Sequence, residues 1–273
     1  MIHILIPTFN RESMILNAID SITVQSYKKW KITIVDNYSS DNTVQIITKK
    51  YRNLINKKIF IKKFKTFVSA AENFNRSLKQ ITSEKYFMLL CSDDYIHKNF
   101  LEIGLRKLNE EKKSCGYCSA IYYVDQNKKI IKKRNYGFYG FEVMASFFFR
   151  NYIGVPSSSI FKTKDYKNFK YPISIPYAAD MVFPLWPYKK KKRIIYDSNP
   201  LSYFMIHSKT DSSNNFGSWT MLVGKYKFRI HIVKKIFNCS KFFQKTLLVI
   251  AKNMLFVEWY FFKFYSFLKC LKK

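Results

Sequence analysis

The first third of the chain alternates between short apolar runs and stretches with helical spacing, and this alternation is the strongest constraint on its fold. It predicts strands at residues 3–6, 31–35, 59–61 and 86–90, and helices at residues 11–23, 41–50 and 69–80. Strands that alternate with helices imply right-handed crossovers and a parallel sheet. We therefore expect a Rossmann-like α/β fold whose ligand-binding loops follow the carboxyl ends of the strands.

A pair of acids, Asp93 and Asp94, follows the apolar run at residues 87–90. Adjacent carboxylates repel each other, and burying them without partners would be costly. A divalent cation such as Mg²⁺ or Mn²⁺ would relieve the repulsion, because both ions take oxygen ligands and keep positions for substrate phosphates. The alternative is that Asp93 starts a turn and caps the following helix, and the pair taken alone favours neither interpretation.

Three polar loops are expected at one edge of this sheet, at residues 7–11, 36–41 and 91–95. Each contains Asp, Asn or Thr, so together they would form one cleft. No glycine-rich phosphate loop follows any of the predicted strands, and the whole chain has only 7 Gly. The diphosphate of a bound nucleotide would therefore need another source of positive charge, and a metal at Asp93 and Asp94 is the available one.

The middle of the chain continues with mixed strand and helix patterns. The pattern predicts helices at residues 98–113, 137–149 and 177–186, and strands at residues 115–124, 157–161, 194–196 and 201–206. Asp180 stands among apolar residues in the last of these helices, where it is either an N-terminal cap or a site group. His207 follows the last strand. No linker, low-complexity tract or internal repeat is expected before about residue 215.

The five cysteines show no spacing typical of a disulfide framework, so we expect reduced thiols in a cytoplasmic protein. Cys115 and Cys118 have the spacing of a redox or zinc half-motif, but no second pair lies nearby and the segment continues as a strand. We expect both to be core cysteines. The amino-terminal residues lack the features of a signal peptide, and no apolar run is long enough to span a bilayer.

The formal net charge is +30, and aromatic residues make up 18% of the chain. Such a composition can follow from an AT-rich genome, or it can attract an anionic partner such as a membrane, a nucleic acid or a phosphate-bearing substrate. From residue 216 onward Glu258 is the only acid among many lysines and aromatic residues. This pattern is typical of an interfacial helix on an anionic membrane, whereas a nucleic-acid tail would carry more Arg and Gly. The alternative is a helical pair packed on the core with solvated lysines.

Three motifs, in their order and spacing, resemble those of family-2 glycosyltransferases of the GT-A fold. They are Ile4-Leu-Ile-Pro-Thr-Phe-Asn-Arg11, Ile34-Val-Asp-Asn-Tyr-Ser-Ser-Asp-Asn-Thr43 and Ser92-Asp93-Asp94. The resemblance covers residues 1–125 closely and residues 126–210 loosely. It implies a GT-A catalytic domain over residues 1–215, with a mixed, mainly parallel sheet flanked by helices. Residues 216–273 would form a basic, aromatic helical appendage that associates with a membrane.

The resemblance also implies residues for the donor. In such enzymes the cleft binds a nucleotide-sugar, and Pro7 and Thr8 match residues that line the nucleoside pocket. Asn10, in the same motif, is assigned to the nucleotide-sugar as well. Asp36 and Asn37 stand where the family usually has two aspartates, the second of which reads the uracil ring. Asn37 offers an acceptor and donors, so a UDP-linked sugar remains the expected donor.

Asn73 matches an Ala-Arg-Asn stretch near the sugar and phosphates, and Glu72 replaces the usual Arg. Asp93 and Asp94 match the metal-binding end of the Asp-X-Asp motif, whose first acid is replaced by Cys91. The resemblance thus implies that one of the two acids meets Mg²⁺ or Mn²⁺ and that the other touches the ribose.

Asp180 resembles the acid that serves as catalytic base, although Ala179 stands in place of the Glu in the usual Glu-Asp pair. In that role it takes a proton from the acceptor hydroxyl, which attacks the anomeric carbon from the opposite face and inverts it. His207 resembles a histidine that closes over the diphosphate or the metal in some relatives. A loop histidine with ordinary hydrogen bonds is the alternative.

The family analogy and the C-terminal composition together predict a lipid-linked, lipopolysaccharide or capsule glycan as the acceptor. The enzyme would then lie peripherally on the inner face of the cell membrane and would bind no nucleic acid. The alternative is a non-catalytic nucleotide-sugar-binding relative. Cys91, Asn37 and Ala179 favour it, because they stand at positions where the family has acids.

Overall fold

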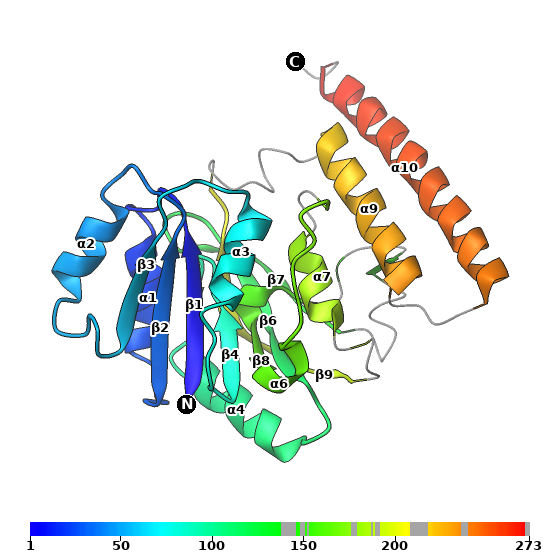
Figure 1. The fold of residues 1–273 in the computed structure, drawn as a ribbon. Coiled ribbons are helices and arrows are strands. Elements are labelled where there is room, and N and C mark those ends of the chain that lie inside the picture. The colour runs from blue at the N-terminus through cyan, green and yellow to red at the C-terminus, as the bar shows by residue number, and fades with distance from the viewer. Residues whose placement is uncertain are drawn as a thin grey trace.

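The computed structural model describes residues 1–137, 146–147, 151, 153–175, 179–186, 188, 192–207, 218–235 and 240–270, with the backbone alone at residues 179–181, 235 and 261–270. These residues form a 9-stranded sheet flanked by helices, and a helical pair follows at the C-terminal end (Figure 1). The strand order is β3-β2-β1-β4-β8-β6-β9-β5, and β7 pairs with β6. The expected mixed, mainly parallel sheet is confirmed.

The first half of the sheet is parallel, as the alternating pattern predicts. Its strands are β1 (Ile2–Thr8), β2 (Trp30–Asp36), β3 (Ile59–Lys63) and β4 (Tyr86–Leu89). The helices between them are α1 (Ile15–Thr23), α2 (Thr43–Lys50) and α3 (Ala70–Leu78). β1 lies between β2 and β4, and its last residue, Thr8, pairs with Asp36. The carboxyl ends of β1, β2 and β4 therefore meet at one edge of the sheet, called the carboxyl edge below.

The second half of the sheet mixes parallel and antiparallel pairs. Its strands are β5 (Tyr95–Ile96), β6 (Gly116–Val124), β7 (Ile130–Arg134), β8 (Ser159–Lys162) and β9 (Ile194–Met205). The helical elements among them are α4 (Phe100–Glu110), the 3₁₀ turn η1 (Pro156–Ser158), α6 (Thr163–Tyr166) and α7 (Ala179–Leu185). β8 joins the two halves because it is antiparallel to both β4 and β6, whereas β6 and β9 are parallel.

Two strand predictions need correction here. The two strands expected at residues 194–196 and 201–206 are one strand, β9, because its pairing with β6 absorbs an irregularity near Ala120 without leaving the sheet. The strand expected at residues 157–161 begins only at Ser159, because η1 occupies the residues before it. β5, which was not expected, forms within the loop after β4 through a short pairing with β9. Most of the helix expected at residues 137–149 lies outside the described residues.

Side chains that alternate along β1 and β4 fill two cores, one on each face of the sheet. Ile4, Ile6 and Met88 belong to the core shared with α1 and α4. Leu5 and Phe87 belong to the other core, which is rich in aromatic rings and includes residues of α6, α7 and α9. A strand that is buried on both faces is composed mainly of apolar residues, which explains the apolar runs in the sequence.

Cys115 and Cys118 are buried in the aromatic-rich core and are not in a disulfide. Burial raises the pKa of Cys115 to about 12 and that of Cys118 to about 11. A thiol that keeps its proton this firmly is a poor nucleophile and a poor metal ligand. The prediction that both are ordinary core cysteines is confirmed.

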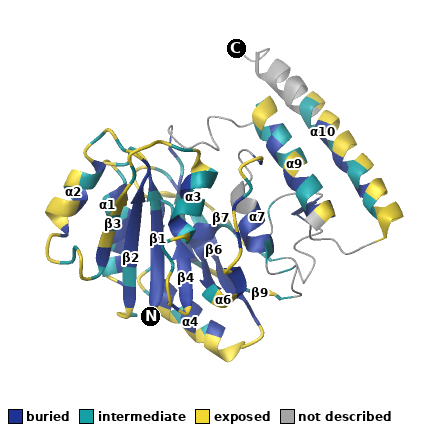
Figure 2. Cartoon of the chain, viewed as in Figure 1, coloured by how far each residue is buried: buried dark blue, intermediate teal, exposed yellow. Residues whose placement is uncertain are grey.

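The helical pair consists of α9 (Trp219–Lys235) and α10 (Lys241–Cys270), which lie side by side (Figure 1). Leu247 and Ala251 of α10 join the core that contains Phe183 of α7 and Phe228 of α9. One face of α10 is thus packed, while the other is largely exposed (Figure 2). Within the described residues, none of the helices combines the length and the apolar character needed to cross a membrane.

Candidate functional site

Two of the three expected loops are fastened to each other at the carboxyl edge. The backbone N–H of Asn10 donates to Ser39 Oγ at 2.9 Å, and the Asn10 side-chain oxygen accepts from the Ser40 N–H at 2.9 Å. The Arg11 N–H donates to Thr43 Oγ1 at 2.8 Å. Asn10 adopts a positive φ of 50°, a conformation that Asn tolerates better than most residues. Its local function is to join the loops after β1 and β2.

Thr8, Asp36 and Asn73 bring buried polar atoms to this edge. Thr8 and Asp36 end neighbouring strands after Pro7 and Val35, which also pair, and Asn73 of α3 donates to the Val35 carbonyl at 3.3 Å. Thr8 Oγ1, Asp36 Oδ1 and Asn73 Oδ1 are buried without hydrogen-bond partners. A buried polar atom without a partner costs roughly 1–3 kcal/mol. A ligand that carries N–H and O–H donors, as a nucleoside does, would satisfy these atoms.

Asn37 is buried and its amide is engaged within the protein. Its Nδ2 donates to the Val68 carbonyl at 2.7 Å, and its Oδ1 accepts from the Val68 N–H at 3.0 Å. Arg76 Nη1 donates to the same oxygen at 3.1 Å. The oxygen expected to read a uracil ring thus already holds two donors, and Asn37 fixes the segment before α3. Reading of the base by this residue stays a prediction.

Glu72, which stands in place of the usual Arg, caps α3. Its backbone N–H donates to Ser69 Oγ, and its carboxylate accepts from the Ser69 backbone N–H and hydroxyl, forming a capping box. An arginine is still present on α3, at Arg76, one turn further along the helix. Arg76 also donates to the Thr66 carbonyl at 2.9 Å and lies over the Phe64 ring. Sequence analysis missed Arg76. It could have been found because it lies four residues after Glu72, the residue that replaces the usual Arg, and therefore on the same face of the helix.

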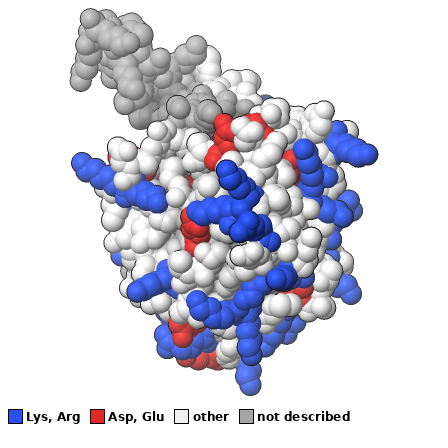
Figure 3. Space-filling view, turned by 90° about the vertical axis from the view of Figure 1, so that its left-hand side faces the viewer, with Lys and Arg blue, Asp and Glu red and all other residues white. Residues whose placement is uncertain are grey.

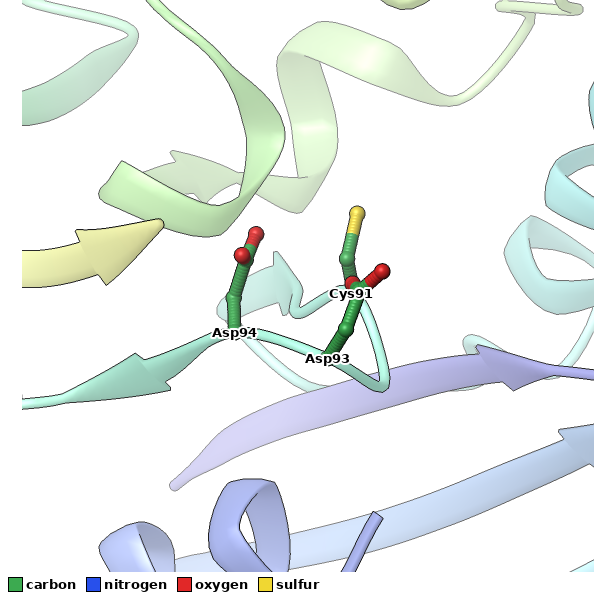
Figure 4. A group of neighbouring side chains, drawn as sticks. All are labelled: Cys91, Asp93 and Asp94. Atoms are coloured by element: carbon green, nitrogen blue, oxygen red, sulfur yellow. The ribbon is translucent and has the colours of Figure 1, made fainter. Parts of the chain in front are cut away.

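Cys91, Asp93 and Asp94 form a cluster in the loop between β4 and β5, called the acid loop below (Figure 4). The Cys91 sulfur and one oxygen of each acid lie within 4.8 Å of one another. Asp94 is only 1% exposed; its Oδ1 accepts from the Met205 N–H at 3.2 Å, and its Oδ2 is buried without a partner. The alternative that Asp93 caps the next helix is wrong, because Asn99 is the N-cap residue of α4.

The electrostatics of the acid loop favour a cation. Burial raises the pKa of Asp94 well above its ordinary value, and the neighbouring Asp93 carboxylate raises it further, although hydrogen bonds from the Ser157 hydroxyl and the Met205 N–H act to lower it. Burial and the Asp93 charge both penalise the charged carboxylate, and a bound cation would offset both. Two carboxylates, one with a buried unpaired oxygen, are the donors that Mg²⁺ and Mn²⁺ prefer. The residues of the acid loop therefore fit a divalent metal.

Two basic residues meet Asp93 at the mouth of the acid loop. His207, after β9, places Nε2 3.1 Å from Asp93 Oδ2, and Arg11, after β1, places Nε 3.9 Å from the same oxygen. His207 thus lies beside Asp93, and its role at the diphosphate or the metal stays a prediction, whereas Arg11 was noted only as the end of a motif. The position of Arg11 in the first of the three converging loops could have predicted that it lies near the acids. The loops after β1, β4 and β9 meet at Asp93.

Asp180 is the second residue of α7, and its side chain lies outside the described side chains. α7 contacts η1, and Ser157 of η1 accepts a hydrogen bond from the Cys91 N–H at 3.0 Å. The helix that carries Asp180 is thus connected to the acid loop through a single turn. The role of Asp180 as catalytic base stays a prediction.

A cavity of about 620 Å³ lies away from this site, at the amino end of β4. Four exposed lysines, Lys85, Lys112, Lys164 and Lys167, are among its lining residues. None of the acids, amides or hydroxyls described above at the carboxyl edge lines this cavity. Its volume therefore does not mark the site that the sequence motifs and the unpaired polar atoms indicate.

Comparisons with known proteins give the family and the fold of the chain. Residues 3–169 match the sequence model of Glycosyl transferase family 2. The chain is 25% identical to the uncharacterized glycosyltransferase MJ1057 of Methanocaldococcus jannaschii over 184 residues, which cover 67% of this chain and 63% of that protein. It is 33% identical to the poly(ribitol-phosphate) beta-N-acetylglucosaminyltransferase TarS of Staphylococcus aureus over 110 residues, which cover 39% of this chain and 18% of TarS. The chain thus spans less than two thirds of the length of either relative.

Solved structures share the fold. The crystal structure of residues 1–349 of TarS in complex with UDP-GlcNAc superposes with a TM-score of 0.69 at 18% identity, covering 92% of this chain and 71% of that one. A mannosyltransferase of Pyrobaculum calidifontis in complex with GDP-Man and Mn²⁺ superposes with a TM-score of 0.63 at 15% identity, covering 93% of this chain and 69% of that one. These likenesses extend the shared fold beyond the residues matched in sequence.

Proposed function

The chain belongs to glycosyl transferase family 2, and from this premise we propose that it transfers a sugar from a nucleotide-sugar to a hydroxyl group of a glycan acceptor. The observation that carries the proposal is the acid loop, where the buried and partly unpaired Asp94 lies beside Asp93 at the edge formed by β1, β2 and β4. Membership of this family supports the assignment of glycosyl transfer to this edge, and the buried hydrogen-bond acceptors there fit a nucleotide.

The donor is proposed to be a UDP-linked sugar. Thr8, Asp36 and Asn73 would accept hydrogen bonds from its nucleoside through their unpaired buried atoms. Pro7 precedes Thr8 at the end of β1, and Asn10 lies in the loop that follows. The TarS structure with the same fold holds UDP-GlcNAc, which supports a uridine nucleotide without identifying the sugar.

A divalent ion, Mg²⁺ or Mn²⁺, is proposed to bind Asp93 and Asp94, where it would offset the negative charge of the leaving diphosphate. Arg11 and His207 hold Asp93 through its Oδ2 and leave its other oxygen free of these two contacts. The Arg11 guanidinium also adds fixed positive charge at the cleft, in a chain that has no glycine-rich phosphate loop.

Asp180 is proposed as the base that takes the proton from the acceptor hydroxyl. That hydroxyl would attack the anomeric carbon on the face opposite the departing nucleotide, so the product would have inverted configuration. The connection of α7 to the acid loop through η1 supports this assignment, because base and leaving group must sit on either side of one carbon.

The test is a turnover assay on the full chain with a panel of nucleotide-sugars and glycan acceptors, with and without Mn²⁺. We expect one donor to give metal-dependent nucleotide release and an inverted product by NMR. Asp180→Asn should abolish transfer while keeping donor affinity, and Asp94→Asn should abolish the metal dependence of donor binding. Glu102→Gln, an exposed acid on α4, is the matched control and should change neither.

Metal-dependent donor binding without turnover on any donor and acceptor would overturn the proposal. That result would instead establish the non-catalytic relative that Cys91, Asn37 and Ala179 first suggested. An active Asp180→Asn variant would refute the assignment of the base alone.

The acceptor is proposed to be an anionic glycan, either lipid-linked or part of a lipopolysaccharide or capsule, at the inner face of the cell membrane. The net charge of +30 favours a polyanionic partner. The relative TarS is a poly(ribitol-phosphate) beta-N-acetylglucosaminyltransferase, which supports a phosphate-bearing acceptor.

The exposed face of α10 supports a membrane location. Phe242, Val249 and Phe256 recur at intervals of seven residues along it and are 80%, 59% and 47% exposed. Lys245 and Lys252 are exposed at the same interval beside them. An apolar stripe flanked by lysines is how a helix lies in the headgroup region of an anionic bilayer, with about 1 kcal/mol per lysine near the surface.

A further inference from the structure

Cys91 is the member of the acid loop to which the proposed reaction gives no role. Its sulfur lies within 4.8 Å of one oxygen of Asp93 and one of Asp94. The three side chains point to the same side of the loop (Figure 4). A sulfur and an oxygen bound to one ion, with bond lengths of roughly 2.3 and 2.2 Å, stand about 3 to 4.5 Å apart, depending on the angle at the ion. Rotation of these side chains toward one another would bring all three donors onto a single ion.

Hydrogen bonds to η1 and β9, and one within the acid loop, hold the segment that carries these donors. The Cys91 N–H donates to Ser157 Oγ of η1 at 3.0 Å, and the Asp94 N–H donates to the Cys91 carbonyl at 3.1 Å. Met205 of β9 donates to Asp94 Oδ1 at 3.2 Å. Donors fixed by hydrogen bonds outside the binding shell are characteristic of metal ligands in proteins.

A separate observation points to a ligand at this position. Asp94 is 99% buried, and its Oδ2 is the one oxygen of that carboxylate with no hydrogen-bond partner. The Met205 N–H occupies only the other oxygen. An unpaired oxygen in a buried carboxylate is costly without a cation, so this oxygen indicates that the cluster binds an ion.

We propose that Cys91 is a sulfur ligand of the metal held by Asp93 and Asp94, and that it shifts the preference of the site from Mg²⁺ toward softer divalent ions such as Mn²⁺ and Co²⁺. The inference rests on the proposed function, since it takes metal binding at the acid loop as given. Carboxylate oxygens suit Mg²⁺ and Mn²⁺, whereas sulfur disfavours the hard Mg²⁺ and follows the order in which Co²⁺ binds more tightly than Mn²⁺. The thiol proton passes to solvent as the metal–sulfur bond forms.

The other described cysteines do not compete for this role. Cys115 and Cys118 are fully buried, and burial raises the pKa of both thiols. Cys91 is only partly buried and is the cysteine among the described side chains that lies beside carboxylates able to share an ion. Among the described side chains, a sulfur signal from bound metal would therefore report on Cys91.

The experiment is a metal titration of the full chain with no nucleotide present. Co²⁺ is the probe, because sulfur bound to Co²⁺ gives a near-ultraviolet charge-transfer absorption that oxygen ligands do not give. Mg²⁺ and Mn²⁺ affinities are measured by calorimetry on the wild type, Cys91→Ser, Cys91→Asp and Asp94→Asn. Cys270→Ser is the matched thiol control, and thermal melts check that each variant folds.

We expect the absorption band in the wild type and in Cys270→Ser, and its loss in Cys91→Ser. Cys91→Asp should lower the ratio of Mn²⁺ to Mg²⁺ affinity by about tenfold, because it restores an oxygen donor. Loss of all metal binding in Asp94→Asn, together with no sulfur band and an unchanged ratio in Cys91→Asp, would overturn the sulfur ligand and leave the metal site standing. Unchanged metal binding in Asp94→Asn would overturn both.

Discussion

Several side chains at the carboxyl edge differ from those that the sequence resemblance implies, and their neighbours explain how the edge is built instead. Glu72 stands where an arginine was expected and caps α3, while Arg76 one turn later bridges Asn37 and Thr66. Asn37 in turn holds the Val68 backbone through both the N–H and the oxygen of its side-chain amide. The positive charge and the loop anchor are thus kept at the edge, but by different residues.

Arg76→Ala should weaken nucleotide-sugar binding by roughly tenfold, because a hydrogen bond to a charged group contributes about 1.5–3 kcal/mol and the segment before α3 loses three such bonds. Binding is measured by calorimetry with the preferred donor. Arg106→Ala, which loses only an exposed pair with Glu110, is the control and should leave the affinity unchanged. Equal affinities in the two variants would show that the anchor is dispensable.

A second group of charges lies at the opposite end of β1. His3 is buried with Nε2 2.8 Å from Thr33 Oγ1 and Nδ1 3.4 Å from Glu84 Oε2, and Lys31 pairs with Glu84. Burial, and then the charge of Lys31, lowers the pKa of His3 to about 4. Burial acts to raise the pKa of Glu84, but Lys31 and backbone donors outweigh it and lower this pKa to about 2.

Acid should therefore destabilise the protein in two overlapping steps. The pKa of His3 falls from 6.5 to about 4 on folding, so its stabilisation is complete above pH 6.5 and is lost as the pH falls toward 4. The pKa of Glu84 falls from 4.5 to about 2, so its stabilisation is lost between pH 4.5 and 2. Urea unfolding of the wild type and of His3→Gln as a function of pH checks this.

The His3→Gln variant should show a flatter dependence of the unfolding free energy on pH between 6.5 and 4. His97→Gln is the matched control, because His97 is partly exposed and its ring Nδ1 accepts a hydrogen bond from the nearby Asn99 N–H. Identical slopes in the wild type and in His3→Gln would contradict the assignment to His3.

Among the helices and strands, those of the first half of the sheet could be predicted from the sequence because their apolar periods are regular. β1, β2 and β4 are largely buried on both faces and read as mainly apolar runs, interrupted by His3 in β1 and by Lys31 and Thr33 in β2. β5 could not be predicted, because it has two residues and exists only through its pairing with β9. β9 read as two strands because Asp197 to Pro200 resembles a turn, and only pairing with β6 keeps it in the sheet.

The site could be predicted in part for the same reason. Thr8, Asp36 and the acid loop follow regular strands, so their convergence follows from topology alone. His207 and Arg11 meet Asp93 only because three loops fold together, a contact that no local pattern encodes. The engagement of Asn37 by Val68 likewise depends on the path of the chain between β3 and α3.

Gly104 in α4 shows tertiary packing overriding helix propensity. Ala is favoured over Gly in a helix by about 1 kcal/mol. A Cβ at Gly104, however, would lie 2.7 Å from both Ile160 Cδ1 and Tyr117 Cδ1. Both residues are fully buried, and Tyr117 is held through its hydroxyl by Asp197. The neighbours therefore have little freedom to move.

Gly104→Ala should consequently destabilise the protein by about 1–3 kcal/mol, the usual cost of overpacking, despite its better helix propensity. Chemical denaturation gives the change in unfolding free energy. Glu102→Ala, an exposed position on the same helix, should be neutral within about 0.5 kcal/mol. An unchanged or raised stability in Gly104→Ala would show that α4 can shift away from β6.

Over the whole molecule the positive charge is widespread. Figure 3 shows lysines and arginines outnumbering acids on the face that carries α2 and β3, far from the helical pair. This spread is what a compositional bias produces, so net charge alone does not single out one binding surface. α10 differs because its exposed lysines border an apolar stripe.

Replacing Phe242, Val249 and Phe256 together by Ser should abolish binding to anionic vesicles, since a buried large apolar side chain contributes roughly 1.5–3 kcal/mol. Flotation with phosphatidylglycerol-containing vesicles and with neutral vesicles measures this. The wild type should bind only the anionic ones, and less at high salt.

The matched control replaces three exposed apolar residues elsewhere, Phe60, Ile130 and Ile173, by Ser, and it should bind vesicles as the wild type does. Equal flotation of the α10 variant and the wild type would refute the membrane face. A wild type that is a dimer and an α10 variant that is a monomer, with equal flotation, would also refute the membrane face. That result would assign the stripe to contact with a second copy of the chain.

The contacts of Arg229 tie this helical pair to the rest of the protein. Its guanidinium binds Glu258 of α10 at 2.6 Å, and its Nε donates to the Phe147 carbonyl at 3.0 Å, so one buried side chain joins α9, α10 and the body. These contacts would hold the helical pair at a fixed position relative to the catalytic cleft. The distance between the cleft and any surface that α10 binds would then be constant. An acceptor anchored to that surface would present to the cleft only the hydroxyl group that lies at this distance from its anchor.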